Sequence, residues 1–193
     1  LTKLKAANPN LKTLISVGGW TWSANFPAAA TSATSRETFA TSCVNFMKTY
    51  GFDGIDIDWE YPVGGGLEQG TAADKHNYTL LLQALRAKLD SQGKIDGNKK
   101  YLLTVAAPAG PSNIANQEVA QVVATVDWVN LMSYDFHGGW DTSTGHNAPL
   151  FKSTGDPGPA GFDVDTAVNT WLSQGTPAAK LVMGVPFYGR GWN

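Results

Sequence analysis

The sequence predicts an α/β fold in which helices cover a parallel sheet. Short runs of β-branched and other apolar residues alternate with helical patterns, and this order is the signature of a parallel sheet with crossover helices. The runs are apolar enough for burial on both faces, as parallel sheets require. Two architectures have these features, a (β/α)8 barrel and a doubly wound sheet. Five strands are readable, whereas a barrel has eight and typically takes about 250 residues, so a barrel here is incomplete.

The predicted strands are each followed by a turn rich in glycine or proline. They cover residues 13–17, 54–59, 101–106, 128–134 and 181–185. The predicted helices cover residues 35–50, 72–91, 116–125 and 165–173. The first helix begins with Thr34 and Glu37 at capping-box spacing and ends at Gly51, while the second ends at Gly93. Residues 137–162 are polar and rich in Gly, Pro and Asn, which predicts one ordered functional loop.

Composition and charge narrow the classes of function. The chain has 193 residues, 42% hydrophobic and 16% charged, so we expect one domain over residues 1–193. The net charge of −2 and the lack of a basic cluster argue against binding to nucleic acid or to an anionic membrane surface. No apolar run reaches the roughly 18 residues that a membrane span needs. The single cysteine, Cys43, lies on an apolar helical stripe and is expected to be buried, without disulfide or zinc. The start at Leu1, without Met or a signal-like segment, predicts a mature or excised piece.

The most informative segment is the acidic strand that ends near residue 60. Because side chains alternate along a strand, Asp56, Asp58 and Glu60 share one face, about 6.6 Å apart at a rise of roughly 3.3 Å per residue. Three residues that suit a helix layer share the other face: Ile55, Ile57 and Trp59. Three carboxyls on one interior face repel one another, so at least one pKa should rise.

A carboxylic acid that keeps its proton near neutral pH is suited to general acid catalysis. Glu60 is the last of the three acids and lies at the carboxyl end of its strand, where parallel barrels place their active sites. An exposed edge strand conflicts with the flanking Ile and Trp pattern. A divalent-metal site requires several oxygens around one point, which a single strand supplies poorly. The spacing therefore favours catalysis, with Glu60 as the acid and Asp58 beside it.

The string DGIDIDWE at Asp53–Glu60 resembles the signature of glycoside hydrolase family 18, the chitinases and their relatives. Four other segments resemble motifs of this family, in the family's order, each at a predicted strand. They are residues 16–20 (SVGGW), 104–109 (TVAAPA), 130–138 (NLMSYDFHG) and 183–192 (MGVPFYGRGW). The motifs span nearly the whole chain. The resemblance implies a TIM-type (β/α)8 barrel in which these five strands correspond to barrel strands three to seven, with strands one, two and eight missing.

The resemblance also implies hydrolysis of the β-1,4 bonds between N-acetylglucosamine units of chitin, with retained configuration. In this family the N-acetyl carbonyl of the substrate attacks the anomeric carbon, so the enzyme supplies no nucleophile. Glu60 matches the general acid and later the base that activates water. Asp58 matches the residue that orients the acetamido group, and Asp56 matches its deeper partner. Tyr134 matches a hydroxyl that binds the acetamido carbonyl.

Further residues match substrate contacts of the family. They are Trp20, Met132, Asp135, Trp140, Tyr188 and Arg190. Trp20 and Trp140 match aromatic platforms on the leaving-group side. The implied ligands are chitin or chitooligosaccharides, with no cofactor and no metal, and the implied location is extracellular because insoluble chitin is met outside the cell. The missing strands leave room for a complementing chain or for self-association.

Two other functions on the same fold stay open. One is a non-catalytic lectin that binds chitin, although such relatives typically replace the last acid of the motif and Glu60 is present here. The other is an endo-β-N-acetylglucosaminidase that cuts N-glycan cores, although the aromatic residues Trp20 and Trp140 favour a linear chitin-like chain.

Overall fold

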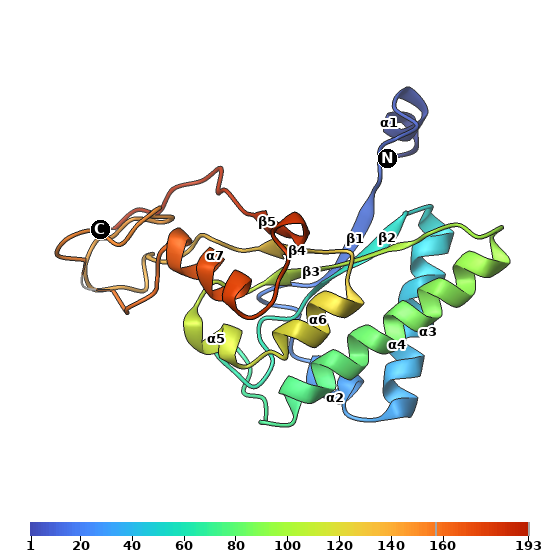
Figure 1. Ribbon diagram of the computed structural model, residues 1–193, viewed down its shortest axis with the longest axis horizontal. Helices are drawn as coiled ribbons and strands as arrows, with labels where there is room; N and C mark the ends of the chain where they lie inside the picture. Colours follow the sequence, from blue (N-terminus) through green and yellow to red (C-terminus); the bar gives the residue numbers. More distant parts are fainter. Residues whose placement is uncertain (157, 193) are drawn as a thin grey trace.

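The protein contains an open parallel sheet of five strands in the order β1-β2-β3-β4-β5 (Figure 1). The computed structural model describes residues 1–156 and 158–192. The strands are β1 (Leu14–Gly18), β2 (Gly54–Asp58), β3 (Leu102–Ala107), β4 (Trp128–Leu131) and β5 (Leu181–Met183). The helices are α1 (Thr2–Ala7), α2 (Phe26–Ala30), α3 (Ala33–Tyr50), α4 (Asp74–Ile95), α5 (Pro111–Ala115), α6 (Val119–Thr125) and α7 (Val164–Ser173), with a 3-10 turn at Ala178–Lys180.

The order of the strands decides between the two architectures that the sequence left open. All four neighbouring pairs are parallel and follow the order of the chain. A doubly wound sheet has a switch point at which the strand order reverses, and the described strands contain none. The sheet is therefore an incomplete (β/α)8 barrel, as predicted, with β1 and β5 as its edges.

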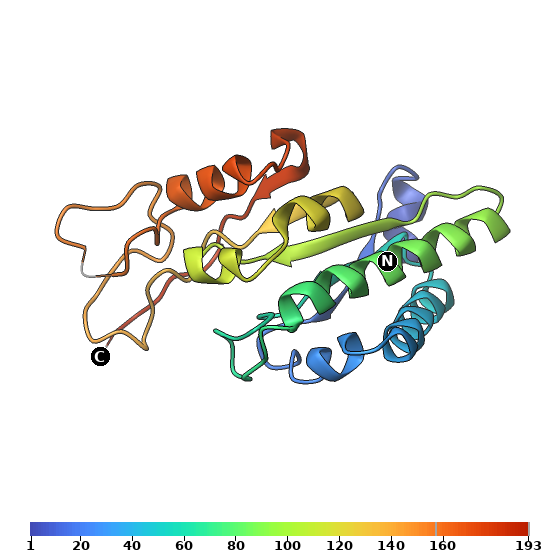
Figure 2. The ribbon, with the colours of Figure 1, turned by 60° about the horizontal axis from the view of Figure 1, so that its bottom comes forward.

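The main core lies between the sheet and the helices that cover one of its sides (Figures 1 and 2). Alternate residues of the central strands point into it and are buried: Ile55, Ile57, Leu103, Val105, Val129 and Leu131. One stripe of α4 meets them with four fully buried leucines: Leu81, Leu82, Leu85 and Leu89. Cys43 of α3 is also buried, as predicted. Among the described helices, none is long and apolar enough to cross a bilayer.

The four predicted helices are present with ends shifted by at most four residues, and two predicted end signals act differently from the prediction. The capping box of α3 is formed by Ser32 and Ser35, because Ser32 has an extended backbone and its Oγ accepts the Ser35 N–H at 3.0 Å. The predicted pair, Thr34 and Glu37, lies inside the helix. The second difference is that α4 continues through Gly93 to Ile95. A Cβ at Gly93 would lie 2.2 Å from the carbonyl oxygen of Lys99, so this glycine permits a close approach of two chain segments and does not end the helix.

Residues 137–162 connect the end of β4 to α7. Their described part contains neither helix nor strand, in agreement with the predicted loop. The loop extends past the carboxyl ends of the strands and lies beside the C-terminal segment (Figure 1), where the Asn147 side chain donates to the Tyr188 carbonyl at 3.3 Å. The strand predicted at 128–134 ends earlier, at Leu131, so residues 132–134 lie beyond the paired part of β4.

Candidate active site

The three acids of the predicted site lie on the open side of the sheet at the carboxyl half of β2. Asp56 and Asp58 belong to the strand, and Glu60 follows it by two residues. Their side chains are half-buried. The residues that alternate with the acids face the helices and are buried: Ile55, Ile57 and Trp59. The alternation deduced from strand geometry is thus present in the fold.

Asp56 is held by polar side chains from neighbouring strands. Its Oδ2 accepts a hydrogen bond from the Ser16 hydroxyl of β1 at 2.9 Å. Its Oδ1 accepts hydrogen bonds from the Thr104 hydroxyl of β3 at 2.5 Å and from the Asn130 amide of β4 at 3.2 Å. The parallel register aligns Ser16, Asp56 and Thr104 across the sheet. Asp56 is therefore fixed on the floor beneath the other two acids.

Asp58 is the last residue of β2, and its carboxyl lacks comparable support. Within the described residues its Oδ1 is buried and has no hydrogen-bond partner. Burial, together with the smaller effects of the Glu60 and Asp56 charges, raises the pKa of Asp58 to about 7. This agrees with the prediction that at least one of the three acids has a raised pKa. Asp58 therefore keeps an unused acceptor oxygen beside Glu60.

Glu60 also has a raised pKa. Burial is the main cause, a hydrogen bond with the Tyr61 side chain opposes it, and the charge of Asp135 adds to the rise. The Glu60 backbone N–H donates to the Ser23 hydroxyl at 2.9 Å. Glu60 therefore combines an anchored main chain with a carboxyl that favours its protonated form, which suits proton donation to a bound substrate.

Tyr134 and Met132 follow β4, and Tyr134 lies near the acids. Burial raises the pKa of Tyr134, and the charges of Asp58 and Glu60 are the next largest causes, which places the phenol in the field of both carboxylates. The side chain of Met132 is half-buried. A Cβ at Gly184 would lie 2.8 Å from the Tyr134 ring, so the glycine after β5 leaves the space that this ring occupies.

Four of the predicted substrate contacts form one cluster around Arg190. The Arg190 Nε donates to Asp135 Oδ1 at 2.9 Å, and the two side chains form an ion pair. The guanidinium carbon lies 4.9 Å from the centroid of Trp140 and 5.2 Å from that of Tyr188. Burial, followed by a hydrogen bond to Asp135, raises the pKa of Tyr188 to about 12. The rings of Tyr188 and Tyr134 meet edge to face at 6.2 Å, which joins this cluster to the acids.

Trp20 is the remaining predicted contact. It lies on the loop after β1, at the same end of the sheet as Glu60, and 47% of its surface is exposed. Its neighbour Trp22, which the sequence reasoning did not single out, is 81% exposed. Both rings are therefore available to a molecule that approaches this loop.

The sequence reasoning missed residues that support the acids. Ser16, Thr104 and Asn130 could have been found, because each is a polar residue within a predicted strand, whereas such strands are otherwise apolar. Ser23 gave no such signal, since it lies in a loop and its role depends on how that loop packs against the end of β2.

The sequence reasoning also missed His137, in the loop after β4. It is buried, with Nδ1 3.2 Å from Asp141 Oδ2 and Nε2 3.0 Å from Asp156 Oδ1.

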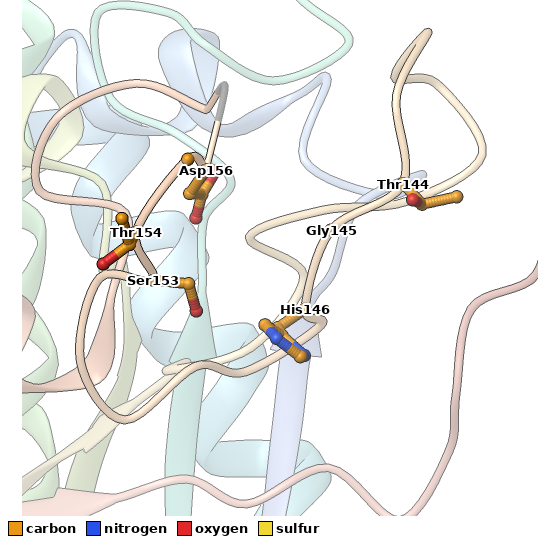
Figure 3. Close-up of a pocket in the computed structure, with 7 residues that line it drawn as sticks. Thr144, Gly145, His146, Ser153, Thr154 and Asp156 are labelled. Carbon is orange, nitrogen blue, oxygen red and sulfur yellow. The ribbon is translucent and has the colours of Figure 1, made fainter.

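A separate hollow of about 370 Å³ lies within the loop that precedes α7 (Figure 3). It is lined by Thr144, Gly145, His146, Ser153, Thr154, Gly155 and Asp156. None of the predicted site residues lines it, so it is distinct from the acidic site. Among the residues that the structure describes, no group of three or more His, Cys, Asp or Glu side chains is arranged to hold a metal ion.

Comparison with known proteins supports the family resemblance and the fold. The sequence model of the glycosyl hydrolases family 18 matches residues 1–193. Chitinase A1 of Niallia circulans is 54% identical over 100% of this chain and 28% of its own length. Chitinase 1 of Aphanocladium album is 47% identical over 97% of this chain and 43% of its own. Among solved structures, chitinase ChiA74 from Bacillus thuringiensis superimposes with a TM-score of 0.90 at 47% identity, over 96% of this chain and 30% of that one. The chain thus spans less than half the length of each of these relatives.

Proposed function

The chain belongs to the glycosyl hydrolases family 18, and on this premise we propose that it hydrolyses the β-1,4 bonds between N-acetylglucosamine units of chitin. The observation that carries the proposal is the pair of half-buried acids at the end of β2, Asp58 and Glu60, both with a raised pKa. Relatives that share between 47% and 54% of the sequence are named chitinases, which supports the same substrate.

The proposed reaction has two steps. Glu60 gives its proton to the glycosidic oxygen while the bond from that oxygen to the anomeric carbon breaks. The N-acetyl carbonyl oxygen of the same sugar forms a bond to the anomeric carbon and takes the place of an enzyme nucleophile. A water molecule then attacks the anomeric carbon and loses a proton to Glu60, which restores the acid and the acetamido group. Two displacements at one carbon retain its configuration.

Asp58 orients the acetamido group in this scheme. Its Oδ1 is buried and has no partner within the described residues, so a rotation of the half-buried side chain presents this acceptor to the acetamido N–H without breaking a hydrogen bond of that oxygen. Asp56, two residues earlier on the same face of β2, is the fixed neighbour of Asp58 in this scheme. Its own carboxyl is held by Ser16, Thr104 and Asn130. As substrate approaches, exclusion of water strengthens these interactions.

The residues around the acids are proposed to contact the sugar chain. The Tyr134 hydroxyl, held near Asp58 and Glu60, donates to the acetamido carbonyl. Met132 lines the floor beside it. The cluster of Asp135, Trp140, Tyr188 and Arg190 binds the sugar chain, and Trp20 offers a further exposed ring on the loop after β1. Flat aromatic faces with polar neighbours suit pyranose rings, which are apolar on their faces and polar at their edges.

The setting of the site is part of the proposal. Chitin is an insoluble polymer outside the cell, so we place the activity in the extracellular space. The edge strands β1 and β5 present unpaired backbone groups, which sheets normally cover. We therefore assign the activity to the full natural polypeptide that carries residues 1–193, or to its complex with a chain that covers these edges.

The test measures release of reducing sugar from chitooligosaccharides by the full natural polypeptide and by Glu60→Gln. Loss of a general acid typically lowers kcat by about 100- to 10,000-fold, and we expect a loss in this range with oligosaccharide binding retained in calorimetry. Glu37→Gln, an exposed change on α3, is the matched control and should keep the wild-type rate. A Glu60→Gln rate equal to wild type would refute the mechanism. Binding without turnover by wild type would identify a lectin, and cleavage of N-glycan cores without chitin cleavage an endo-β-N-acetylglucosaminidase.

A further inference from the structure

The main chain of Glu60 lies beyond the paired part of β2. The register between β1 and β2 ends at Gly18 and Asp58, so the strand ladder offers no partner to the Glu60 N–H. That N–H donates instead to the Ser23 hydroxyl at 2.9 Å. Ser23 is 4% exposed, so water does not replace this hydrogen bond.

The Ser23 hydroxyl also joins its own loop to the strand. Its Oγ lies 2.8 Å from the Gly19 carbonyl oxygen and 3.3 Å from the Asp58 carbonyl oxygen, and it can donate to either. The Gly19 N–H in turn donates to the Asp58 carbonyl at 2.8 Å. The loop after β1 is thus bound to the end of β2 at the Asp58 carbonyl, and Ser23 supplies the link to the Glu60 N–H.

Close packing restricts the same segment from two directions. A Cβ at Gly18 would lie 2.0 Å from the Asp58 carbonyl oxygen, and a Cβ at Gly66 would lie 1.9 Å from the Glu60 carbonyl oxygen. Both glycines therefore allow backbone segments to touch the strand end. The Glu60 peptide thus lies between two loops, and the Ser23 hydroxyl accepts its N–H.

Ser23 is itself held firmly. Its carbonyl accepts the Phe26 N–H at 3.1 Å at the start of α2. The Phe26 ring stacks on Trp59 at 5.2 Å with an interplanar angle of 12°, on the core side of the strand that carries the acids. Ser23 is therefore connected to both the acid strand and its supporting core.

We propose that Ser23 is a positioning residue that sets the location of the Glu60 carboxyl by binding the Glu60 main chain. This inference rests on the proposed function and adds a residue outside the acidic motif to its machinery. Without the hydroxyl, the buried Glu60 N–H has no partner, and the strand end shifts to reach water or another acceptor. A displacement of about 1 Å at a catalytic group can cost on the order of 100-fold in rate.

The test compares Ser23→Ala with Ser32→Ala in the full natural polypeptide. Both changes remove a serine hydroxyl that accepts a backbone N–H, but Ser32 caps α3 away from the acids. For Ser23→Ala we expect kcat on a chitooligosaccharide to fall about tenfold or more, with Kd changed less than about twofold, because the loss falls on the transition state. Ser32→Ala should lower Tm and leave kcat unchanged.

A second readout does not depend on turnover. The titration of Glu60 is followed by NMR of 13C-labelled glutamate, assigned by comparison with Glu60→Gln. Ser23→Ala should lower the pKa of Glu60 toward its ordinary value, because a displaced carboxyl loses part of the burial that raises it. Ser32→Ala should not change this titration.

The outcomes separate this inference from the proposed function. An unchanged Glu60 titration with unchanged kcat in Ser23→Ala, or equal effects of Ser23→Ala and Ser32→Ala, would overturn the positioning role. A wild-type protein without turnover would refute the proposed function, and the titration alone would then decide for or against Ser23. If Ser23→Ala does not fold, Ser23→Cys replaces it, since a thiol of similar shape is a weaker acceptor.

Discussion

Asp58→Asn is expected to stabilise the folded protein at alkaline pH and to have little effect near pH 4. Burial, followed by the charges of Glu60 and Asp56, raises the pKa of Asp58 from 3.8 to about 7 in the folded state. Because the folded protein holds this proton more tightly than the unfolded chain, ionisation of Asp58 opposes folding. The cost is absent below the unfolded pKa of 3.8, grows between 3.8 and about 7, and is complete above about 7. Asparagine removes it.

The magnitude follows from the same two values. At about 1.4 kcal/mol for each pH unit, the interval from 3.8 to about 7 corresponds to about 4 kcal/mol. Part of the Asp58 side chain remains accessible to water, and solvent screening reduces this to about 2 kcal/mol. Asp58→Asn should therefore raise the free energy of unfolding by about 2 kcal/mol at pH 8 and by only a few tenths at pH 4.

Urea unfolding at a series of pH values between 4 and 8 tests this, for wild type, Asp58→Asn and Asp165→Asn. Asp165 is exposed in the first turn of α7 and should gain no stability from the change as pH rises. If Asp58→Asn were no more stable than wild type at pH 8, or if its advantage did not grow with pH, the account of a buried and destabilised carboxyl would be wrong.

Two further predictions concern a glycine beside the acids and an aspartate in the loop before α7. Gly18→Ala should destabilise the protein by more than about 3 kcal/mol or prevent folding, because Gly18 has φ +116° and its Cβ would overlap the Asp58 carbonyl. Gly51→Ala is the control: Gly51 has φ +72° and open space around it, so the change should cost only about 1 to 2 kcal/mol in thermal unfolding. Asp156→Asn should lower the free energy of unfolding at pH 7 by about 1.5 to 3 kcal/mol, because Asp156 accepts the Gly158 N–H at 2.7 Å and contacts His137 at 3.0 Å. The Gly158 N–H and then His137 lower the pKa of Asp156, so this difference should shrink as pH falls below 3.8, and a difference independent of pH would contradict the assignment.

The acidic site was accessible to sequence reasoning because its main feature is local. Alternation along a strand follows from covalent geometry, so Asp56, Asp58 and Glu60 had to share one face if the segment was a strand. Tyr134 and Asp135 became candidates through the family resemblance of the motif at 130–138 and not through alternation. The ends of helices were harder to predict from the sequence. Both Gly51 and Gly93 resemble stop signals, yet only Gly51, with φ 72°, caps a helix, while Gly93 is required by the approach of Lys99.

The sequence by itself determined the class of fold, the strand that carries the acids and the face on which they lie, because these depend on periodicity within short segments. Only the tertiary structure decided the sequential strand order and the supports of Asp56, which come from residues 40, 48 and 74 positions away in the chain. It also decided how strongly burial raises the pKa of Asp58, and that a loop serine binds the main chain of Glu60. Register, burial and loop return depend on pairing between distant segments, which no local pattern specifies.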